Sequence, residues 1–211
     1  MRFIQANILN IALSGGLSAL NMLLSIIEAR ILGPEKLGNY QVFVSTQTIV
    51  FTIFAFGLGN AGIYFINSGK STPKEYVSTV LRLEIVLAII VFLSLFCIVY
   101  FNTSYFGILP MPALILYCIG SGFTLFTTAI TPVLLARYEI YKYQAIGYVT
   151  SLLSIAAIYM FFLLEGSFDI SLMLIIAAVC KIISALTLLW FIRLDIDFSI
   201  PFKIDSLVKY L

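Results

Sequence analysis

The stretch "LMLIIAAVCKIISALTLLW", residues 172–190, decides the fold because it is nearly all apolar and holds a single charged residue, Lys181. An α-helix needs about 20 predominantly apolar residues to cross the roughly 30 Å of hydrocarbon in a bilayer. The apolar run extends over residues 170–192, which is long enough. We therefore predict that this segment is a transmembrane helix.

The rest of the chain has the same character. Of its 211 residues, 62% are hydrophobic and 10% are charged, and the mean hydropathy is +1.10. Soluble domains carry about 25% charged residues, so this composition excludes a water-soluble globule. Six apolar runs are expected to cross the membrane: residues 8–32, 40–66, 80–100, 112–135, 144–164 and 170–192. We predict an all-α integral membrane domain of six transmembrane helices over residues 1–192, followed by a cytoplasmic segment over residues 193–211.

The basic residues predict the orientation of these helices. With six spans, both termini lie on one side of the membrane. That side would hold Arg2, Lys70, Lys74, Arg82, Arg137, Lys142, Arg193, Lys203 and Lys209, whereas the other side would hold Arg30 and Lys36. Because cytoplasmic loops are enriched in Lys and Arg, we predict that both termini are cytoplasmic.

Three glycines near the end of the second apolar run have the spacing of a nucleotide-binding motif. Gly57, Gly59 and Gly62 match G-x-G-x-x-G, but that motif requires a short strand before the glycines and a helix of several turns after them. Residues 40–56 instead continue an uncharged apolar run. We predict no nucleotide or nucleic-acid partner, and we assign the glycines to close helix–helix contact, for which membrane helices use small residues.

The sequence contains no recognisable catalytic or metal-binding constellation. It lacks histidine, the commonest general base and metal ligand, and Cys97, Cys118 and Cys180 lie singly inside apolar runs. No serine–base pair or paired acidic motif can be placed. An enzyme is therefore disfavoured, no cofactor or metal is expected, and movement of a substrate through the membrane fits better.

Lys181 is the strongest candidate for a functional residue. It lies eleven residues from each end of its run, near the bilayer midplane, where a charge costs about 2.5–3.5 kcal/mol on insertion scales. We expect it to face protein or a water-filled cavity and to bind substrate. The alternative is a structural lysine that is paired with a backbone carbonyl or a glutamate. Asn21 and Gln47, polar residues at intermediate depth, either line the same cavity or tie helices together.

Further charged residues lie near the ends of the apolar runs. Glu28 and Arg30 are near the outer end of the first run, and Arg82 and Glu84 are near the inner end of the third. Each can be an ordinary charge at the membrane interface. Because no other acidic residue comes as close to a membrane-spanning position, Glu28 and Glu84 are the candidates for ion coupling.

A more specific pattern runs from Ala29 to Ile66, "ARILGPEKLGNYQVFVSTQTIVFTIFAFGLGNAGIYFI". It resembles the first loop and second helix of polysaccharide-biosynthesis flippases, which belong to the superfamily of multidrug, oligosaccharidyl-lipid and polysaccharide exporters. The residues that carry the resemblance are Arg30, Leu32, Gly33, Pro34, Glu35, Gly38, Tyr40, Gly57 and Gly59. Leu37 departs from the pattern, because the family more often has phenylalanine there. The motif covers less than a fifth of the chain, whereas the topology matches over its whole length.

The resemblance implies one six-helix lobe of a two-lobe, MATE-like transporter in a bacterial cytoplasmic membrane. Such proteins move a polyprenyl-pyrophosphate-linked oligosaccharide from the inner to the outer leaflet. A cationic cavity would bind the pyrophosphate, with Lys181 and Arg30 as candidates, although no family motif covers Lys181. Residues 193–211 would lead into an absent seventh helix, so the partner would be a missing C-terminal lobe or a second copy of the chain.

Two other functions stay open. A cation-coupled multidrug antiporter of the same superfamily would need an acidic residue in its cavity. A non-transporting membrane scaffold would need no cavity charge. A transport measurement that compares a lipid-linked sugar with cationic dyes separates the three.

Overall fold

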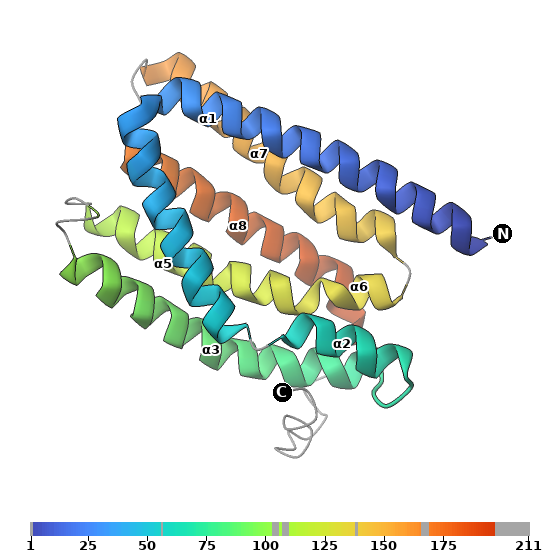
Figure 1. The fold of residues 1–211 in the computed structure, drawn as a ribbon. Helices are drawn as coiled ribbons and strands as arrows, with labels where there is room; N and C mark the ends of the chain where they lie inside the picture. Colours follow the sequence, from blue (N-terminus) through green and yellow to red (C-terminus); the bar gives the residue numbers. More distant parts are fainter. Residues whose placement is uncertain are drawn as a thin grey trace.

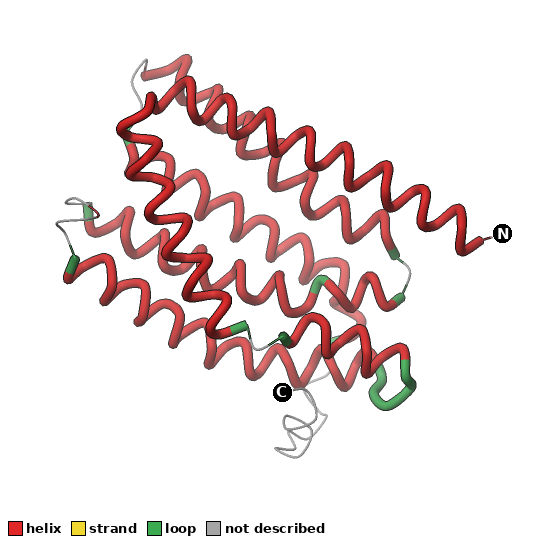
Figure 2. Tube along the Cα trace, in the orientation of Figure 1, coloured by secondary structure: helices red, strands yellow, loops and turns green. Residues whose placement is uncertain are grey.

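The computed structural model describes residues 2–55, 57–102, 106, 110–137, 139–165 and 169–196, and these are almost entirely helical (Figure 2). The elements are α1 (Arg2–Phe54), α2 (Leu58–Asn67), α3 (Pro73–Phe101), α5 (Met111–Ile130), α6 (Pro132–Ala136), α7 (Ile140–Glu165), α8 (Ile170–Ile192) and the 3-10 turn η1 (Arg193–Asp195). Five helical segments are long and apolar enough to cross a membrane. The prediction of an all-α, multi-pass membrane protein is confirmed.

The first two predicted spans form one bent helix. The apolar part of α1, Asn10–Phe54, has 45 residues, and at 1.5 Å per residue it is about 68 Å long, enough for two crossings. The bend lies at Gly33, whose φ of 72° and ψ of 172° are not helical. Glycine adopts positive φ without strain, and Pro34 then occupies the first position of the resumed helix, where its missing N–H costs little. Figure 1 shows α1 turning back sharply at this point.

The second predicted span, residues 40–66, is not continuous. α1 ends at Phe54 and α2 begins at Leu58, after Gly57 in a left-handed conformation with φ 69°. Hydropathy does not reveal this break, because the residues on both sides of it are apolar. α2 then packs closely on its neighbours through small residues. A Cβ on Gly59 would lie 3.0 Å from the carbonyl oxygen of Thr128, and one on Gly62 would lie 2.5 Å from the Tyr76 ring. The packing role predicted for Gly59 and Gly62 is confirmed. For Gly57 it is wrong, because a Cβ there would meet nothing within 4 Å; Gly57 instead provides the positive φ at the helix break.

Proline breaks the fourth predicted span near one end. α5 stops at Ile130 and the short α6 starts at Pro132, as expected for a residue that has no N–H to donate. The same helix carries two sites of very close approach. A Cβ on Gly120 would lie 2.7 Å from the Cα of Ala178 on α8, and one on Gly122 would lie 3.2 Å from the Cβ of Ala88 on α3. Small residues therefore join α3, α5 and α8.

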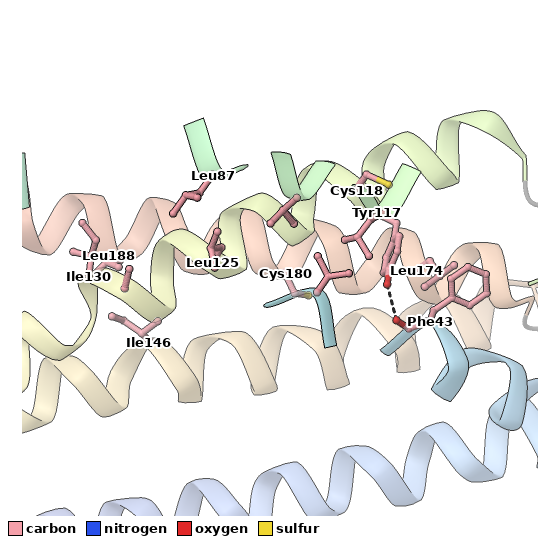
Figure 3. Packing of buried hydrophobic residues seen from close by; sticks show 14 of the residues in the cluster. Phe43, Leu87, Tyr117, Cys118, Leu125, Ile130, Ile146, Leu174, Cys180 and Leu188 are labelled. Atoms are coloured by element: carbon pink, nitrogen blue, oxygen red, sulfur yellow. Dashed lines mark hydrogen bonds between the residues drawn. The ribbon is translucent and has the colours of Figure 1, made fainter. Parts of the chain in front are cut away.

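These three helices form the core of the bundle, and the first half of α1 lies beside α7 on the other side (Figure 1). Fully buried apolar side chains fill the space between the core helices: Val91, Leu95, Cys118, Leu125, Leu174 and Leu188. Figure 3 shows the last four of these. Figure 1 places the start of α1, the α2–α3 turn and the end of α6 at one end of the bundle. The bend in α1, the end of α7 and the start of α8 lie at the other end.

The last described residues are tied to the bundle. The Arg137 guanidinium, at the end of α6, forms two parallel hydrogen bonds of 2.5 Å with the Asp195 carboxylate in η1. The pKa of Arg137 is raised by these hydrogen bonds, although desolvation acts in the opposite direction. Residues 197–211, which make up most of the predicted cytoplasmic segment, lie outside the described part of the chain, so that prediction remains open.

Candidate functional site

Lys181 is paired inside the protein. Its Nζ donates a hydrogen bond of 2.7 Å to Oε1 of Gln47, which lies in the second half of α1 and is 4% exposed. Lys181 itself is half-buried on α8. The structure therefore brings together two of the predicted site residues. The partner is a neutral amide and not the glutamate or backbone carbonyl considered as the structural alternative.

An aromatic ring completes the surroundings of the ammonium group. The Tyr117 ring on α5 has its centroid 6.0 Å from Lys181 Nζ, at the limit for a cation–π contact. The Tyr117 hydroxyl donates a 2.7 Å hydrogen bond to the backbone carbonyl of Phe43, one turn before Gln47 (Figure 3). Among the described residues, Lys181 forms no ion pair. In the described part of the chain, the ammonium group is therefore surrounded by neutral groups.

A large polar cavity comes within one helical turn of Lys181 on α8, although Lys181, Gln47 and Tyr117 are not among its lining residues. It has a volume of about 770 Å³ and lies between the first half of α1, α7 and the group formed by α2, α5 and α6. Its polar lining residues are Asn10, Ser14, Ser18, Asn21, Asn60, Thr127, Thr128, Thr131, Tyr143, Gln144 and Ser184. Ser184 lies one helical turn after Lys181 on α8, so the cavity and the ammonium occupy neighbouring parts of the bundle. The described lining carries no charged side chain and offers many hydrogen-bond donors and acceptors.

Polar contacts join α1 to α7 along one wall of this cavity. Gln144 Nε2 donates to Asn10 Oδ1 at 3.0 Å and to Ser14 Oγ at 2.7 Å. Further along α7, Ser151 Oγ donates to Asn21 Oδ1 at 2.6 Å. Asn21 thus both lines the cavity and ties two helices together, the two roles that its sequence position left open. Hydrogen bonds of this kind are a main source of association between membrane helices.

The remaining predicted residues lie apart from Lys181. Arg30 is exposed close to the Gly33 bend, and Glu28 is half-buried one turn before the bend. Glu84 is buried on α3 and lines a different cavity. None of these three forms a hydrogen bond or ion pair with Lys181 in the described part of the chain. Arg30 therefore does not join Lys181 in a single cationic centre.

Sequence reasoning missed Tyr117 and Gln144. Tyr117 carries a hydroxyl in the middle of an apolar run, and Gln144 is an amide at the very start of one. Both signals were present, but neither shows which helix the side chain faces. Within the described residues, no group of three or more His, Cys, Asp or Glu side chains could hold a metal ion.

Comparisons with known proteins address the family. Comparison with curated proteins gave no significant match, and comparison with solved structures gave none either. The family model described as "Polysaccharide biosynthesis protein" matches residues 4–210, almost the whole chain. That match agrees with the motif between Ala29 and Ile66 and with the bundle of membrane helices. The chain belongs to the polysaccharide biosynthesis protein family of membrane proteins.

Proposed function

We propose that the protein exports a polyprenyl-pyrophosphate-linked oligosaccharide across the cytoplasmic membrane of a bacterium. The observation that carries the proposal is the Lys181 ammonium, held by Gln47 and unpaired with any acid in the described chain, one helical turn from an uncharged polar cavity. The family match supports a role in polysaccharide synthesis. The five helices that are long and apolar enough to cross a membrane support a role in the membrane.

The ammonium is suited to the pyrophosphate of the lipid carrier. A charge at membrane depth is costly and marks a functional site when it faces protein or water. Gln47 lowers that cost without neutralising the charge, because it offers an amide oxygen at 2.7 Å. A pyrophosphate oxygen would form a stronger, charge-assisted hydrogen bond with the same ammonium. We therefore assign Lys181 to anion binding and Gln47 to holding it in the absence of substrate.

The polar cavity is suited to the sugar. Oligosaccharides present hydroxyl groups that both donate and accept hydrogen bonds, and the lining offers amides and hydroxyls of both kinds, among them Asn10, Asn60 and Gln144. The volume of about 770 Å³ is in the range of ordinary ligand sites. Asn21 contributes to the same wall.

The cavity lies toward the basic end of the bundle. Its lining includes residues of α2 and α6, and the α2–α3 turn and the end of α6 lie at one end of the bundle. Lys70 is in that turn, and Arg137 follows α6. The excess of basic residues at that end favours a cytoplasmic location for it and for both termini. Substrate would then enter from the leaflet in which it is made. The second lobe that the family resemblance implies would enclose the other side of the substrate.

Export by a strain that lacks its own flippase tests the proposal. We expect Lys181→Gln to abolish or strongly reduce surface polysaccharide and Lys181→Arg to reduce it less, with normal amounts of protein in the membrane. Lys142→Gln is the matched control, because Lys142 pairs with Glu139 outside this cavity. Normal export by Lys181→Leu would show that the lysine is structural. Transport of cationic dyes instead of lipid-linked sugar would favour a multidrug antiporter.

A further inference from the structure

Glu84 is a buried carboxyl group that forms no hydrogen bond with the described residues. It is 1% exposed, and neither carboxyl oxygen has a hydrogen-bond partner among the described residues. It lies on α3 and lines a second cavity of about 470 Å³ that is separate from the polar one. Apart from Glu84, this cavity is lined by apolar side chains, Cys118 and glycine: Leu81, Ile85, Ala88, Ile89, Phe92, Cys118, Ile119, Gly122, Phe123, Phe126 and Leu189.

The cavity lies at the apolar outer face of the bundle. Ile85 and Ile89, which flank it on α3, are 55% and 57% exposed, and Ile119 on α5 is also exposed. These helices are among the segments long and apolar enough to cross the membrane. If α3 and α5 cross the membrane as their length and composition indicate, a side chain at the base of this cavity would face hydrocarbon and not water.

None of the described residues that line the cavity carries a positive charge that would stabilise the ionised form of Glu84. The elements that surround the cavity are α3, α5 and α8, and Cys118 is its other titratable lining residue. The nearest charged residue along α3 is Arg82, which is two positions away, and residues at that spacing point in different directions on a helix. An unpaired carboxylate in an apolar medium is very costly, and such groups take up a proton instead.

We propose that Glu84 is a proton-binding site reached from the apolar outer face of α3 and α5. The neutral acid fits the cavity, whereas the anion would be desolvated without compensation. A role of this site in coupling proton movement to export rests on the proposed function. In an exporter, release of this proton would require a change in the α3–α5 packing that admits water or a cation.

Reaction with dicyclohexylcarbodiimide tests both parts of the proposal, because this apolar reagent attacks protonated carboxyl groups in hydrocarbon. The carboxyl O–H adds across one C=N bond, so that the oxygen bonds to the central carbon and the proton goes to nitrogen. The O-acylisourea then rearranges to a stable N-acylurea, and no atom is lost. Mass spectrometry of the full protein in lipid nanodiscs locates the adduct. Glu75, exposed in the first turn of the same helix, is the internal control.

We expect the adduct on Glu84 and not on Glu75, with slower formation as the pH rises. Infrared spectra at neutral pH should show a protonated carboxyl band in the wild type that is lost in Glu84→Gln. That variant should fold normally, because the amide mimics the neutral acid in size and charge. An identical carboxyl band in wild type and Glu84→Gln would overturn the proposal, since Glu84 would then be ionised. Absence of the Glu84 adduct would overturn its access from the outer face.

Export in vesicles addresses the functional role separately. We expect wild-type export of a lipid-linked oligosaccharide to respond to a pH gradient and Glu84→Gln to lose that response. An equal response in both would remove Glu84 from coupling, whatever its protonation. If the wild type moves no lipid-linked sugar while Glu84 still reacts, the proposed export function fails and the proton site stands.

Discussion

Lys181 on α8 and Gln47 on α1 lie 134 residues apart in the sequence, yet their side chains meet in a 2.7 Å hydrogen bond within the membrane bundle. The contact joins the returning half of α1 to the core helix α8. Because α1 reaches this position only by bending at Gly33, the site depends on that bend. The geometry of one glycine and the location of the ammonium are thus physically connected.

The first prediction removes the acceptor of this hydrogen bond. Gln47→Leu should destabilise the protein by about 1–3 kcal/mol, because the ammonium would lose its partner in a buried position. Export should fall as well. Gln47→Glu should keep the stability but weaken substrate binding, since an ion pair would occupy the charge. Thermal unfolding in detergent and export by a flippase-deficient strain measure both effects.

Gln41→Leu is the control for this prediction, because Gln41 lies on the same half of α1 and is exposed. It should leave stability and export unchanged. Equal stability of Gln47→Leu and wild type would contradict the role assigned to Gln47.

The helices were predictable from the sequence, because crossing a bilayer requires about 20 apolar residues and such runs are visible directly. The resemblance between Ala29 and Ile66 predicted the family. Two features could not be predicted. The break at Gly57 lies inside an apolar run, so the hydropathy of the sequence does not reveal it. The partner of Lys181 depends on which faces of α1 and α8 meet, and one-dimensional periodicity does not contain that information.

The same reasoning explains the partial success with the site. Lys181, Gln47 and Asn21 stood out because polar side chains are rare at membrane depth. Tyr117 and Gln144 escaped notice because tyrosine packs like an apolar residue and Gln144 lies at a helix end. Arg30 was assigned to the cationic cavity because of the family resemblance, and Glu28 to ion coupling because it lies near the end of an apolar run. Three-dimensional packing places them near the bend, without a bond to Lys181.

The second prediction concerns the bend in α1. Gly33→Ala should destabilise the protein by about 1–3 kcal/mol, because φ 72° with ψ 172° is a backbone conformation that essentially only glycine adopts without strain. Export should decline too, since the bend positions Gln47. Gly38→Ala is the matched control: a Cβ there meets nothing within 4 Å, and its φ is not positive. Similar melting temperatures for the two variants would contradict the requirement for glycine at position 33.

The third prediction concerns the contact between α5 and α8. Gly120→Val should disrupt the bundle, because even a Cβ at position 120 would lie 2.7 Å from the backbone of Ala178. Overpacking of this kind costs about 1–3 kcal/mol or more. Gly15→Val is the control, since a Cβ at Gly15 meets nothing within 4 Å. Thermal unfolding in detergent compares them, and a loss confined to Gly15→Val would refute the assigned contact.

The fourth prediction concerns the Arg137–Asp195 pair. Asp195→Asn should destabilise the protein by about 1–3 kcal/mol, because the buried carboxylate forms two hydrogen bonds with the guanidinium. The pKa of Arg137 is raised, so its contribution is fully present below the unfolded pKa of arginine. It is lost only as the pH rises through the folded value. We therefore expect a stability difference between wild type and Asp195→Asn that is constant from neutral to moderately alkaline pH.

Glu139→Gln is the control for that pair, because the Glu139–Lys142 ion pair lies at the surface and such pairs contribute little. Its effect should be much smaller than that of Asp195→Asn. If the two variants melt alike across the pH range, the tie between α6 and η1 contributes no stability.

The last prediction concerns orientation. The end of the bundle with the α2–α3 turn carries most of the basic residues, and we expect it to face the cytoplasm. In a background with Cys97, Cys118 and Cys180 replaced by serine, a cysteine at exposed Ser68 should react with a membrane-impermeant maleimide only after the cells are opened. A cysteine at exposed Glu35, beside the Gly33 bend, should react in intact cells. Because both positions lie in the same chain and are exposed, accessibility differs only through the membrane. Reaction of the Ser68 variant in intact cells would invert the orientation and would place the polar cavity toward the outer leaflet.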